Sequence, residues 1–420
     1  MSSRRHAGWR RLSGCLLLAA AVGPTAAATN LPGLAWGDYP PNLPVFFLEA
    51  QGPLSREQKT PGQVRCLPPQ PQAGADTNLP AVVRIHGATS SGYPKKSFAL
   101  TLDNPAGWMG LPPRRHWVLN AAYIDRSLMR HKLAYDLFRS LAAPQTPRHA
   151  AGSRFVEVYF NGGYHGVHLL MERVDGQLLG LRPFNSNELH HACLYKAVDH
   201  AADFGRAGNA GFEQREPEPE RLAYWPPLQE LTRFVSSAPR EKFFDPQAGV
   251  ESLLDLDNAI DFHLLVLVTG NRDGITKNYL VARDAPASDT APRPRFFFVP
   301  WDYDGTFGRD WNASRVGVEF WLTNHLFERL RQNPEYRARF AARWRHCRDG
   351  PFSAKSIQGM MEANARTLGE AAGRNFQRWP LNRGPYPDRL TFEEDLAQMR
   401  TWIEARLQWL DREIERWAKR

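Results

Sequence analysis

The sequence predicts an α+β protein with a β-rich N-terminal lobe and a mainly helical C-terminal lobe. Two observations carry this prediction. Between residues 81 and 175, short runs alternate between apolar and polar residues, and Gly- and Asn-rich turns separate them. Beyond residue 315, apolar residues instead recur at the three-to-four-residue spacing of helices. A chain of 420 residues with 42% hydrophobic side chains is long enough to bury a large core in two lobes.

The first 28 residues are typical of a signal peptide. A basic start precedes an apolar run of roughly ten residues, which suits a secretion signal, whereas a membrane-spanning helix needs ~20. We therefore expect the mature chain, residues 29–420, to be soluble and to be secreted or to lie in the periplasm or cell envelope. Within it, we expect an irregular Pro-rich segment at 29–80, apart from a strand at "VFFL", a β-rich lobe at 81–175 and a mainly helical lobe at 176–420.

Charge and cysteine content narrow the range of partners. The leader holds four Arg and no acid, so its removal lowers the net charge from +9 to +5. No dense Lys/Arg block accompanies this charge, so we infer no nucleic-acid binding. Cys66, Cys193 and Cys347 remain after cleavage. An oxidising compartment would permit one disulfide among them, and the absence of a C-x-x-C pair argues against structural zinc.

Sequence patterns predict the structure of three segments between residues 81 and 175. Residues 81–104 should form strand, loop and strand, because "AVVRIHG" and "KSFALTL" have strand composition and small residues separate them. Residues 125–142 should form a helix with Asp125 as its N-cap and leucines near one face. Residues 154–175 should form a hairpin, because "NGG" lies between two β-rich runs.

The positions of Pro and Gly and the spacing of apolar residues predict the remaining strands and helices. A strand is expected at 192–198, and "REPEPE" and "WPP" predict a loop-rich insertion at 205–250. Residues 254–270 should form a mostly buried helix that Gly270 ends. Strands at "NYLVARD" and "FFFVP" come next, and a final helix at 390–419 carries an apolar stripe that predicts core packing.

Acidic and amide side chains should converge at one end of the last two strands. "NRDGITKN" places Asp273 and Asn278 just before the outgoing strand, and the returning strand runs into "WDYDG", which holds Asp302 and Asp304. If the strands pair antiparallel, the start of the first lies beside the end of the second. Asn278 then lies close to Asp302.

This residue set suits phosphoryl transfer. Oxygen ligands are those that Mg²⁺ prefers, and the reaction needs a metal ion at the phosphate oxygens plus an acid that orients the attacking hydroxyl. Asp273 would take the second role. Asn278 and Asp302 would hold the metal, with Asp304 as a further ligand or support. "NRDGITKN" also resembles the kinase pattern H-R-D-x-x-x-x-N, which is a short motif.

The N-terminal lobe is expected to supply the nucleotide clamp. The small-residue loop around Ser90 can approach phosphates through its backbone amides. Lys95 and Lys96 follow, and only one should point inward, because strand side chains alternate. Lys96 is in phase with Phe98 and Leu100, so we expect Lys96 to face inward and contact phosphate.

Two further features complete this expected clamp. Arg84, on the preceding strand, is a second candidate phosphate contact. A buried lysine needs an acidic partner, and the candidates are Glu172 at the end of the hairpin and Asp136 on the helix.

Each motif also has a more ordinary interpretation. Asp273 and Asn278 suit a helix-terminal loop, "WDYDG" a turn and "PKKS" a solvated basic turn. The order in which they occur favours a metal–phosphate site. His263 is interpreted as a core residue, and His165 and His168 as surface residues of the hairpin.

Taken together, the motifs resemble the CotH (spore-coat protein H) kinase family. The resemblance covers about residues 80–420 and rests on "RIHGATSSGYPKKSFAL", "WVLNAAYIDRSLMRHKLAYDL", "FVEVYFNGGYHGVHLLMERVD", "LYKA", "NRDGITKNY" and "PWDYDGTFG", in this order. It implies a secreted, atypical two-lobed protein-kinase-like fold that binds ATP with Mg²⁺ (or Mn²⁺) and phosphorylates Ser or Thr of envelope or extracellular proteins.

The resemblance also implies residue roles. Asp273 corresponds to the catalytic acid, Asn278 with Asp302 and Asp304 to the metal ligands, and "PKKS", with Lys96, to the phosphate-contacting region. Arg130 matches a position that the family usually fills with Arg, which we interpret as structural. The family commonly has R-G-N-S-S where this chain has "HGATS" at 86–90. The chain lacks that Arg and Asn, which implies weaker phosphate contacts from this segment.

Three alternatives stay open at this point. "DYD" in "WDYDG" is a D-x-D triplet, which glycosyltransferases use to hold a metal-bound sugar nucleotide. That interpretation leaves "NRDGITKN" and "PKKS" without a role. A non-catalytic surface or coat-assembly module is the second alternative, because some family members act as adhesins. Transfer of AMP instead of phosphate is the third, because it uses the same metal and similar acids.

Overall fold

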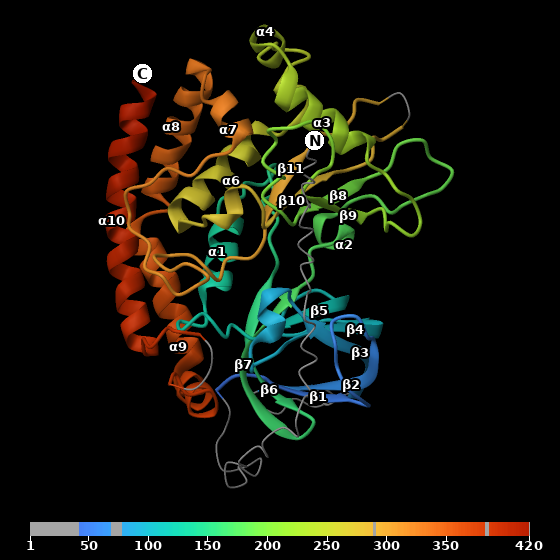
Figure 1. Ribbon diagram of the computed structural model, residues 1–420, viewed down its shortest axis with the longest axis vertical. Helices are drawn as coiled ribbons and strands as arrows, with labels where there is room; N and C mark the ends of the chain where they lie inside the picture. Colours follow the sequence, from blue (N-terminus) through green and yellow to red (C-terminus); the bar gives the residue numbers. More distant parts are fainter. Residues whose placement is uncertain (1–41, 69–77, 289–290, 383–385, 420) are drawn as a thin grey trace, which may run out of the picture. The chain divides into compact units, whose positions relative to one another are not determined.

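The strands of the N-terminal half close into a barrel. The computed structural model describes residues 42–68, 78–288, 291–382 and 386–419, so the signal-peptide prediction for 1–28 lies outside the described residues. The barrel runs in the order β1-β2-β3-β4-β5-β7-β6, and a parallel pairing of β1 with β6 closes it (Figure 1). Its strands are β1 (Val45–Ala50), β2 (Thr60–Leu67), β3 (Asn78–His86), β4 (Ser97–Ala106), β5 (Arg114–Asn120), β6 (Ser153–Phe160) and β7 (Gly163–Glu172).

Alternating side chains fill the barrel interior. Phe98 and Leu100 of β4 and Trp117 and Leu119 of β5 are each at most 1% exposed and belong to one apolar cluster. The alternation of apolar and polar residues in the sequence therefore corresponds to the inner and outer faces of the barrel. The predicted hairpin of β6 and β7 is confirmed.

The expectation of irregular structure throughout 29–80 is wrong for β2 and for the start of β3. The sequence did not predict β2, because the strand contains Pro61 and Gly62, residue types that are depleted in strands. Gly62 is needed because a Cβ there would lie 2.1 Å from the carbonyl oxygen of Glu49 on β1. The missing side chain therefore lets two barrel strands approach closely.

A second sheet has the order β11-β10-β8-β9. It consists of β8 (Cys193–Ala197), β9 (Phe212–Glu216), β10 (Tyr279–Arg283) and β11 (Phe297–Pro300). The strands β10 and β11 pair antiparallel with Tyr279 opposite Pro300, as the sequence predicted. The start of β10 and the end of β11 therefore lie at the same end of the hairpin.

The helices are concentrated in the C-terminal half, so the chain is α+β. They are α1 (Arg130–Arg139), α2 (Gly176–Leu179), α3 (Pro226–Ser237), α4 (Arg240–Phe243), α5 (Val250–Leu253), α6 (Leu256–Thr269), α7 (His325–Leu330), α8 (Pro334–Asp349), α9 (Ala354–Arg378) and α10 (Phe392–Ala418), with short 3₁₀ turns η1 (Thr89–Gly92) and η2 (Asp273–Ile275). The long helix α10 packs against α6, α8 and α9 (Figure 1). Among the described residues, no helix combines the length and apolarity needed to cross a bilayer.

Two helix predictions need correction. The segment 205–250 is not simply loop-rich, because Pro226 and Pro227 begin α3 instead of breaking structure, and the first turn of a helix tolerates proline. The helix predicted at 125–142 begins only at Arg130, because Leu128 has a left-handed backbone with φ of 60°. Asp125 is therefore not its N-cap.

The helix α6 ends as predicted. Gly270 has φ of 65°, and a Cβ there would lie 2.8 Å from the ring of Trp402 on α10. Both the backbone conformation and the close approach therefore require glycine. His263, within α6, is a buried core residue whose Nε2 lies 2.8 Å from the carbonyl oxygen of Leu322, as interpreted from the sequence.

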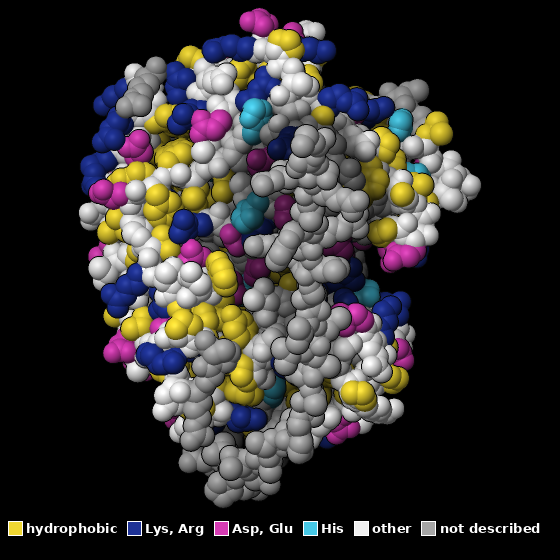
Figure 2. Space-filling model, viewed as in Figure 1, with side chains coloured by type: hydrophobic (Ala, Val, Ile, Leu, Met, Phe, Trp, Pro, Cys, Tyr) yellow, Lys and Arg dark blue, Asp and Glu magenta, His cyan; other side chains and the backbone are white. Residues whose placement is uncertain are grey.

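Charged side chains are mixed on the face shown in Figure 2. There, Lys and Arg over the long C-terminal helices alternate with Asp and Glu and do not form one block. Cys66, Cys193 and Cys347 are all free, so none of the disulfides that the sequence permitted is present.

Candidate active site

The loop after β11 brings together the predicted acids. Asn278 directly precedes β10 and Asp302 follows β11, so the register places them at the same end of the hairpin, as expected. Both have left-handed backbones, with φ of 57° at Asn278 and 61° at Asp302. Asn and Asp tolerate this conformation better than other residues with side chains, and such conformations cluster at functional sites.

Asp302, Asp304 and His131 form a compact cluster. One ligand atom from each lies within 4.8 Å of the others. Burial, followed by the charges of Asp302 and Asp125, raises the pKa of the Asp304 carboxyl well above its usual range. His131 Nε2 lies 3.8 Å from Asp302 Oδ1. The cluster therefore brings two carboxyl groups and an imidazole together, and among the described residues no Lys or Arg forms a salt bridge with either acid.

The helix α1 holds this loop through its backbone. The hydroxyl of Tyr135 accepts the N–H of Asp302 at 3.1 Å, and Nδ1 of His131 accepts the N–H of Tyr303 at 3.0 Å. Arg130 Nε donates to the carbonyl oxygen of Thr306 at 2.9 Å. The sequence analysis assigned no role to His131 or Tyr135. Their four-residue spacing, which places both on one helix face, was the available signal.

Arg130 also anchors the loop to α10. Its guanidinium lies 2.6 Å from Asp125 and 2.5 Å from Asp395, and all three side chains are buried. The Asp125 carboxylate accepts N–H groups of Ser127 and Arg130, so this acid organises the turn before α1. The structural interpretation of Arg130 is confirmed.

Asp273 lies in η2 with its side chain 31% exposed. Lys277 Nζ lies 3.0 Å from its carboxylate, and His200 Nε2 lies 3.9 Å away. Asn271 donates to the carbonyl oxygen of Asp302 at 3.2 Å and accepts the N–H of Gly274 at 2.9 Å. The turn that carries Asp273 is thereby attached to the acidic loop.

The inward lysine is Lys95, and the expectation for Lys96 is wrong. Lys95 is 1% exposed, and its Nζ donates to the carbonyl oxygen of Val167 and, at 2.9 Å, to Asn375 Oδ1. Lys96 is half-buried and donates to the carbonyl oxygen of Ser91 at 2.7 Å. Because β4 begins only at Ser97, the strand alternation does not extend back to Lys96.

The loop before Lys96 is closed on itself and braced by the hairpin. The carbonyl oxygen of Ser90, in η1, accepts the N–H of Tyr93 at 3.2 Å. His165 Nε2 accepts the N–H of Lys96 at 3.2 Å, and His168 Nε2 lies 3.1 Å from the carbonyl oxygen of Lys96. The interpretation of both histidines as surface residues is wrong, because they hold this backbone and His168 is fully buried.

Neither proposed acidic partner reaches a clamp lysine. Glu172 pairs with Arg114 at 3.0 Å, because the end of β7 lies beside β5. Asp136 pairs with Lys132 on its own helix at 2.7 Å. The prediction that Glu172 or Asp136 supports Lys96 is therefore wrong.

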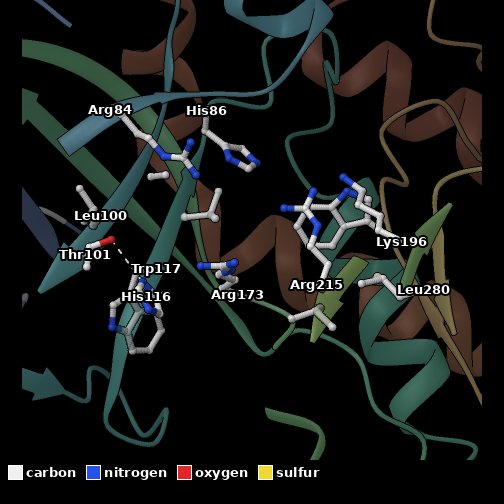
Figure 3. A pocket seen from close by; sticks show the side chains of 14 residues that line it. Arg84, His86, Leu100, Thr101, His116, Trp117, Arg173, Lys196, Arg215 and Leu280 are labelled. Atoms are coloured by element: carbon white, nitrogen blue, oxygen red, sulfur yellow. Dashed lines mark hydrogen bonds between the residues drawn. The ribbon is translucent and has the colours of Figure 1, made fainter. Parts of the chain in front are cut away.

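A strongly basic pocket lies between the barrel and the second sheet. Residues of β3, β4 and β5 line one side, and residues of β8, β9 and β10 line the other. Arg84, Arg173, Lys196 and Arg215 contribute positive charge, and none of the described residues that line the pocket is Asp or Glu (Figure 3). The pocket is open to solvent, and its empty space, solvent included, amounts to about 650 Å³. Arg84, a candidate phosphate contact in the sequence, is one of the lining residues.

Lys196 connects the pocket to the acids. Its Nζ lies 4.8 Å from the ring centroid of Trp301, the residue before Asp302. Burial, then the charge of Arg215, lowers the pKa of Lys196, while Asp302 acts in the opposite direction. No carboxylate among the described residues pairs with Lys196. A single lysine in the otherwise apolar run "ACLYKAV" was the signal for this residue in the sequence.

This pocket also contains His86, the first residue of the segment 86–90 that differs from the family's usual R-G-N-S-S. His86 lines the pocket, and burial together with Lys196 lowers its pKa to about 4, so it is neutral near pH 7. The positive charge comes instead from Arg173, Lys196 and Arg215, which lie beside it in the same pocket.

A cation-lined pocket beside an acidic cluster is the arrangement of enzymes that act on phosphate-containing substrates. The family described as CotH kinase protein matches residues 83–410, so the chain belongs to this family. The chain is also similar to Inner spore coat protein H of Bacillus subtilis (strain 168), with 27% identity over 286 residues, which covers 62% of this chain and 72% of that protein. The resemblance inferred from the motifs is confirmed.

Proposed function

We propose that this chain is a metal-dependent phosphotransferase with a protein-kinase-like fold. It transfers the γ-phosphate of ATP to Ser or Thr of a protein in the cell envelope or outside the cell, which it reaches through the signal peptide at 1–28. The basic pocket lies next to the acidic cluster, and this supports the proposal. Lys196 and Trp301 line the pocket and contact each other, and Trp301 directly precedes Asp302 in the chain. Phosphoryl transfer needs both parts in contact with one nucleotide.

The acidic cluster fits a divalent cation. Asp302 and Asp304 offer carboxylate oxygens, and Asn278 offers an amide oxygen at the same end of the hairpin. Oxygen ligands of this kind favour a hard cation such as Mg²⁺ or Mn²⁺. When bound, the ion supplies charge neutralisation at the phosphate oxygens.

The pocket fits the nucleotide. Its four cationic side chains match a triphosphate, and apolar residues such as Val118, Val174 and Leu280 offer a surface for the base. Lys196 takes the role expected of Lys96, because Lys196 lines the pocket whereas Lys96 is bound to its own loop. Arg84 keeps its proposed phosphate contact.

Asp273 acts on the acceptor. Its partial exposure allows a Ser or Thr hydroxyl of a protein substrate to approach. The carboxylate then accepts the hydroxyl proton, while Lys277 and His200 orient it.

Two other functions have a specific observation behind them. The side chains of Asp302 and Asp304 lie together beside a pocket that also suits the diphosphate of a sugar nucleotide, which favours a glycosyltransferase. The name of the similar B. subtilis protein places that protein in the inner spore coat, which favours a non-catalytic assembly role.

Labelled ATP tests these functions directly. Residues 29–420 are incubated with γ-labelled ATP and Mg²⁺ or Mn²⁺ and a generic acceptor protein, beside Asp273→Asn and Asp304→Asn. Glu362→Gln, which changes an exposed acid on α9, is the control. We expect labelled protein with the wild type and the control only.

The other outcomes separate the alternatives. Label from α-labelled but not γ-labelled ATP indicates AMP transfer, and stronger binding of a sugar nucleotide than of ATP indicates a glycosyltransferase. No label and no ATP-dependent rise in melting temperature contradicts the phosphotransferase proposal and favours the assembly role.

A further inference from the structure

His131 is the member of the acidic cluster with the least obvious role. Its side chain is buried in α1, with the residue 3% exposed. Nδ1 accepts the N–H of Tyr303 at 3.0 Å, and Nε2 has no hydrogen-bond partner. Nε2 faces Asp302 Oδ1 at 3.8 Å. A buried and unpaired polar atom therefore points at the proposed metal site.

The hydrogen bond at Nδ1 determines the tautomer. A neutral imidazole has one N–H group, and a ring nitrogen that accepts a backbone N–H cannot carry it. The proton must therefore be on Nε2.

This tautomer is the opposite of what a metal ligand requires. Coordination through Nε2 needs a free lone pair there and a proton on Nδ1. That proton would face the N–H of Tyr303 across 3.0 Å, so two donors would oppose each other. Histidine ligands instead donate their second N–H to a carboxylate, carbonyl or water.

We propose that His131 is a positioning residue, which donates from Nε2 to Asp302 and leaves the metal with oxygen ligands only. A relative movement of less than ~1 Å shortens the observed separation to a normal N–H···O bond. One oxygen of Asp302 is then held by His131, and the other stays free for the cation. This inference rests on the proposed function and deepens it, because an all-oxygen site favours Mg²⁺ or Mn²⁺ over zinc.

Two matched substitutions separate the two ring nitrogens. In His131→Asn, the amide oxygen replaces Nδ1 as acceptor for Tyr303, and the donor to Asp302 is lost. In His131→Gln, the amide nitrogen can replace Nε2 as the donor. Melting temperatures of both variants show whether the loop on α1 remains folded.

Pulsed electron paramagnetic resonance with Mn²⁺ as the probe provides a readout that does not depend on activity. For residues 29–420 of the wild type, we expect Mn²⁺ binding without the hyperfine coupling of a directly bound imidazole nitrogen. Both variants should bind Mn²⁺ with similar affinity. We expect kcat to fall by roughly tenfold in His131→Asn and much less in His131→Gln, because only the first loses a hydrogen bond to a charged group.

The outcomes distinguish this inference from the proposed function. Nitrogen coupling in the wild type that disappears in His131→Asn makes His131 a ligand and overturns the inference alone, as does an equal loss of kcat in both variants. No Mn²⁺ binding by the wild type, with or without ATP, overturns both the metal site and this inference.

Discussion

The side-chain amide of Asn271 donates to the carbonyl oxygen of Asp302 at 3.2 Å. Its Oδ1 simultaneously accepts the N–H of Gly274 at 2.9 Å. One buried residue therefore joins the turn of Asp273, the proposed base, to the loop of the proposed metal ligands. Neither hydrogen bond involves a reacting group. Asn271 therefore fixes the position of the Asp273 turn relative to the loop that carries Asp302.

Removal of this link should reduce catalysis more than binding. In Asn271→Ala, we expect kcat to fall by about tenfold to a hundredfold, because two hydrogen bonds of about 1 kcal/mol each are lost and the turn can move. The ATP dissociation constant should change little. Asn271→Asp is a second variant, which keeps the acceptor for Gly274, loses the donor to Asp302 and adds a carboxylate. A larger loss in affinity than in kcat would contradict this role.

Asp304 should stabilise the metal-bound protein and destabilise the metal-free protein. Asp304 is partly buried, and desolvation together with the charge of Asp302 raises the pKa of its carboxyl. In Asp304→Asn, we therefore expect the metal-free free energy of unfolding to rise by about 1 to 2 kcal/mol. The increase in melting temperature that Mg²⁺ causes in the wild type should disappear. Lower metal-free stability in the variant would show that another group compensates Asp304.

The two candidate phosphate lysines can be compared directly. We expect Lys196→Met to weaken ATP binding by about tenfold or more, because a charged hydrogen bond contributes about 1.5 to 3 kcal/mol. Lys96→Met should leave ATP affinity nearly unchanged, because the Lys96 ammonium donates to the carbonyl oxygen of Ser91 in its own loop. Titration with a fluorescent ATP analogue measures both. The reverse result would restore Lys96 as the phosphate contact.

His263 should make the protein sensitive to acid. Burial lowers its pKa from 6.5 to about 4, so the unfolded chain binds a proton at a pH where the folded chain does not. This contribution is complete above pH 6.5 and is lost as the pH falls, by about 3 kcal/mol at pH 4. In His263→Gln, whose amide can still bond Leu322, urea unfolding should depend less on pH between 6.5 and 4. An unchanged pH slope would assign the acid sensitivity to other groups.

The acids of the candidate site were predictable because a local pattern positions them. Two strands with a turn between them return the chain to its starting point, so Asn278 and Asp302 converge whatever surrounds them. The end of α6 was predictable for a similar reason, because Gly270 marks it within the sequence itself.

The clamp was not predictable in the same way. Strand alternation assigned Lys96 to the inside, but the strand starts one residue later, and Lys95 is the buried residue. The partner of Lys95 is Asn375, 280 residues away on α9. The cations that surround the pocket also come from separate segments, among them Arg173 and Arg215, and no motif in the sequence groups them.

By itself the sequence determined the α+β class, the hairpins, the long C-terminal helix and the order of the acids, because periodicity and turn residues act over a few positions. Only the tertiary structure decided that β1 closes the barrel against β6, that the Lys196 ammonium lies against Trp301 beside the acids, and that His131 accepts the backbone N–H of Tyr303. These relationships depend on burial and hydrogen bonds between distant segments. Such contacts exist only after the chain has folded.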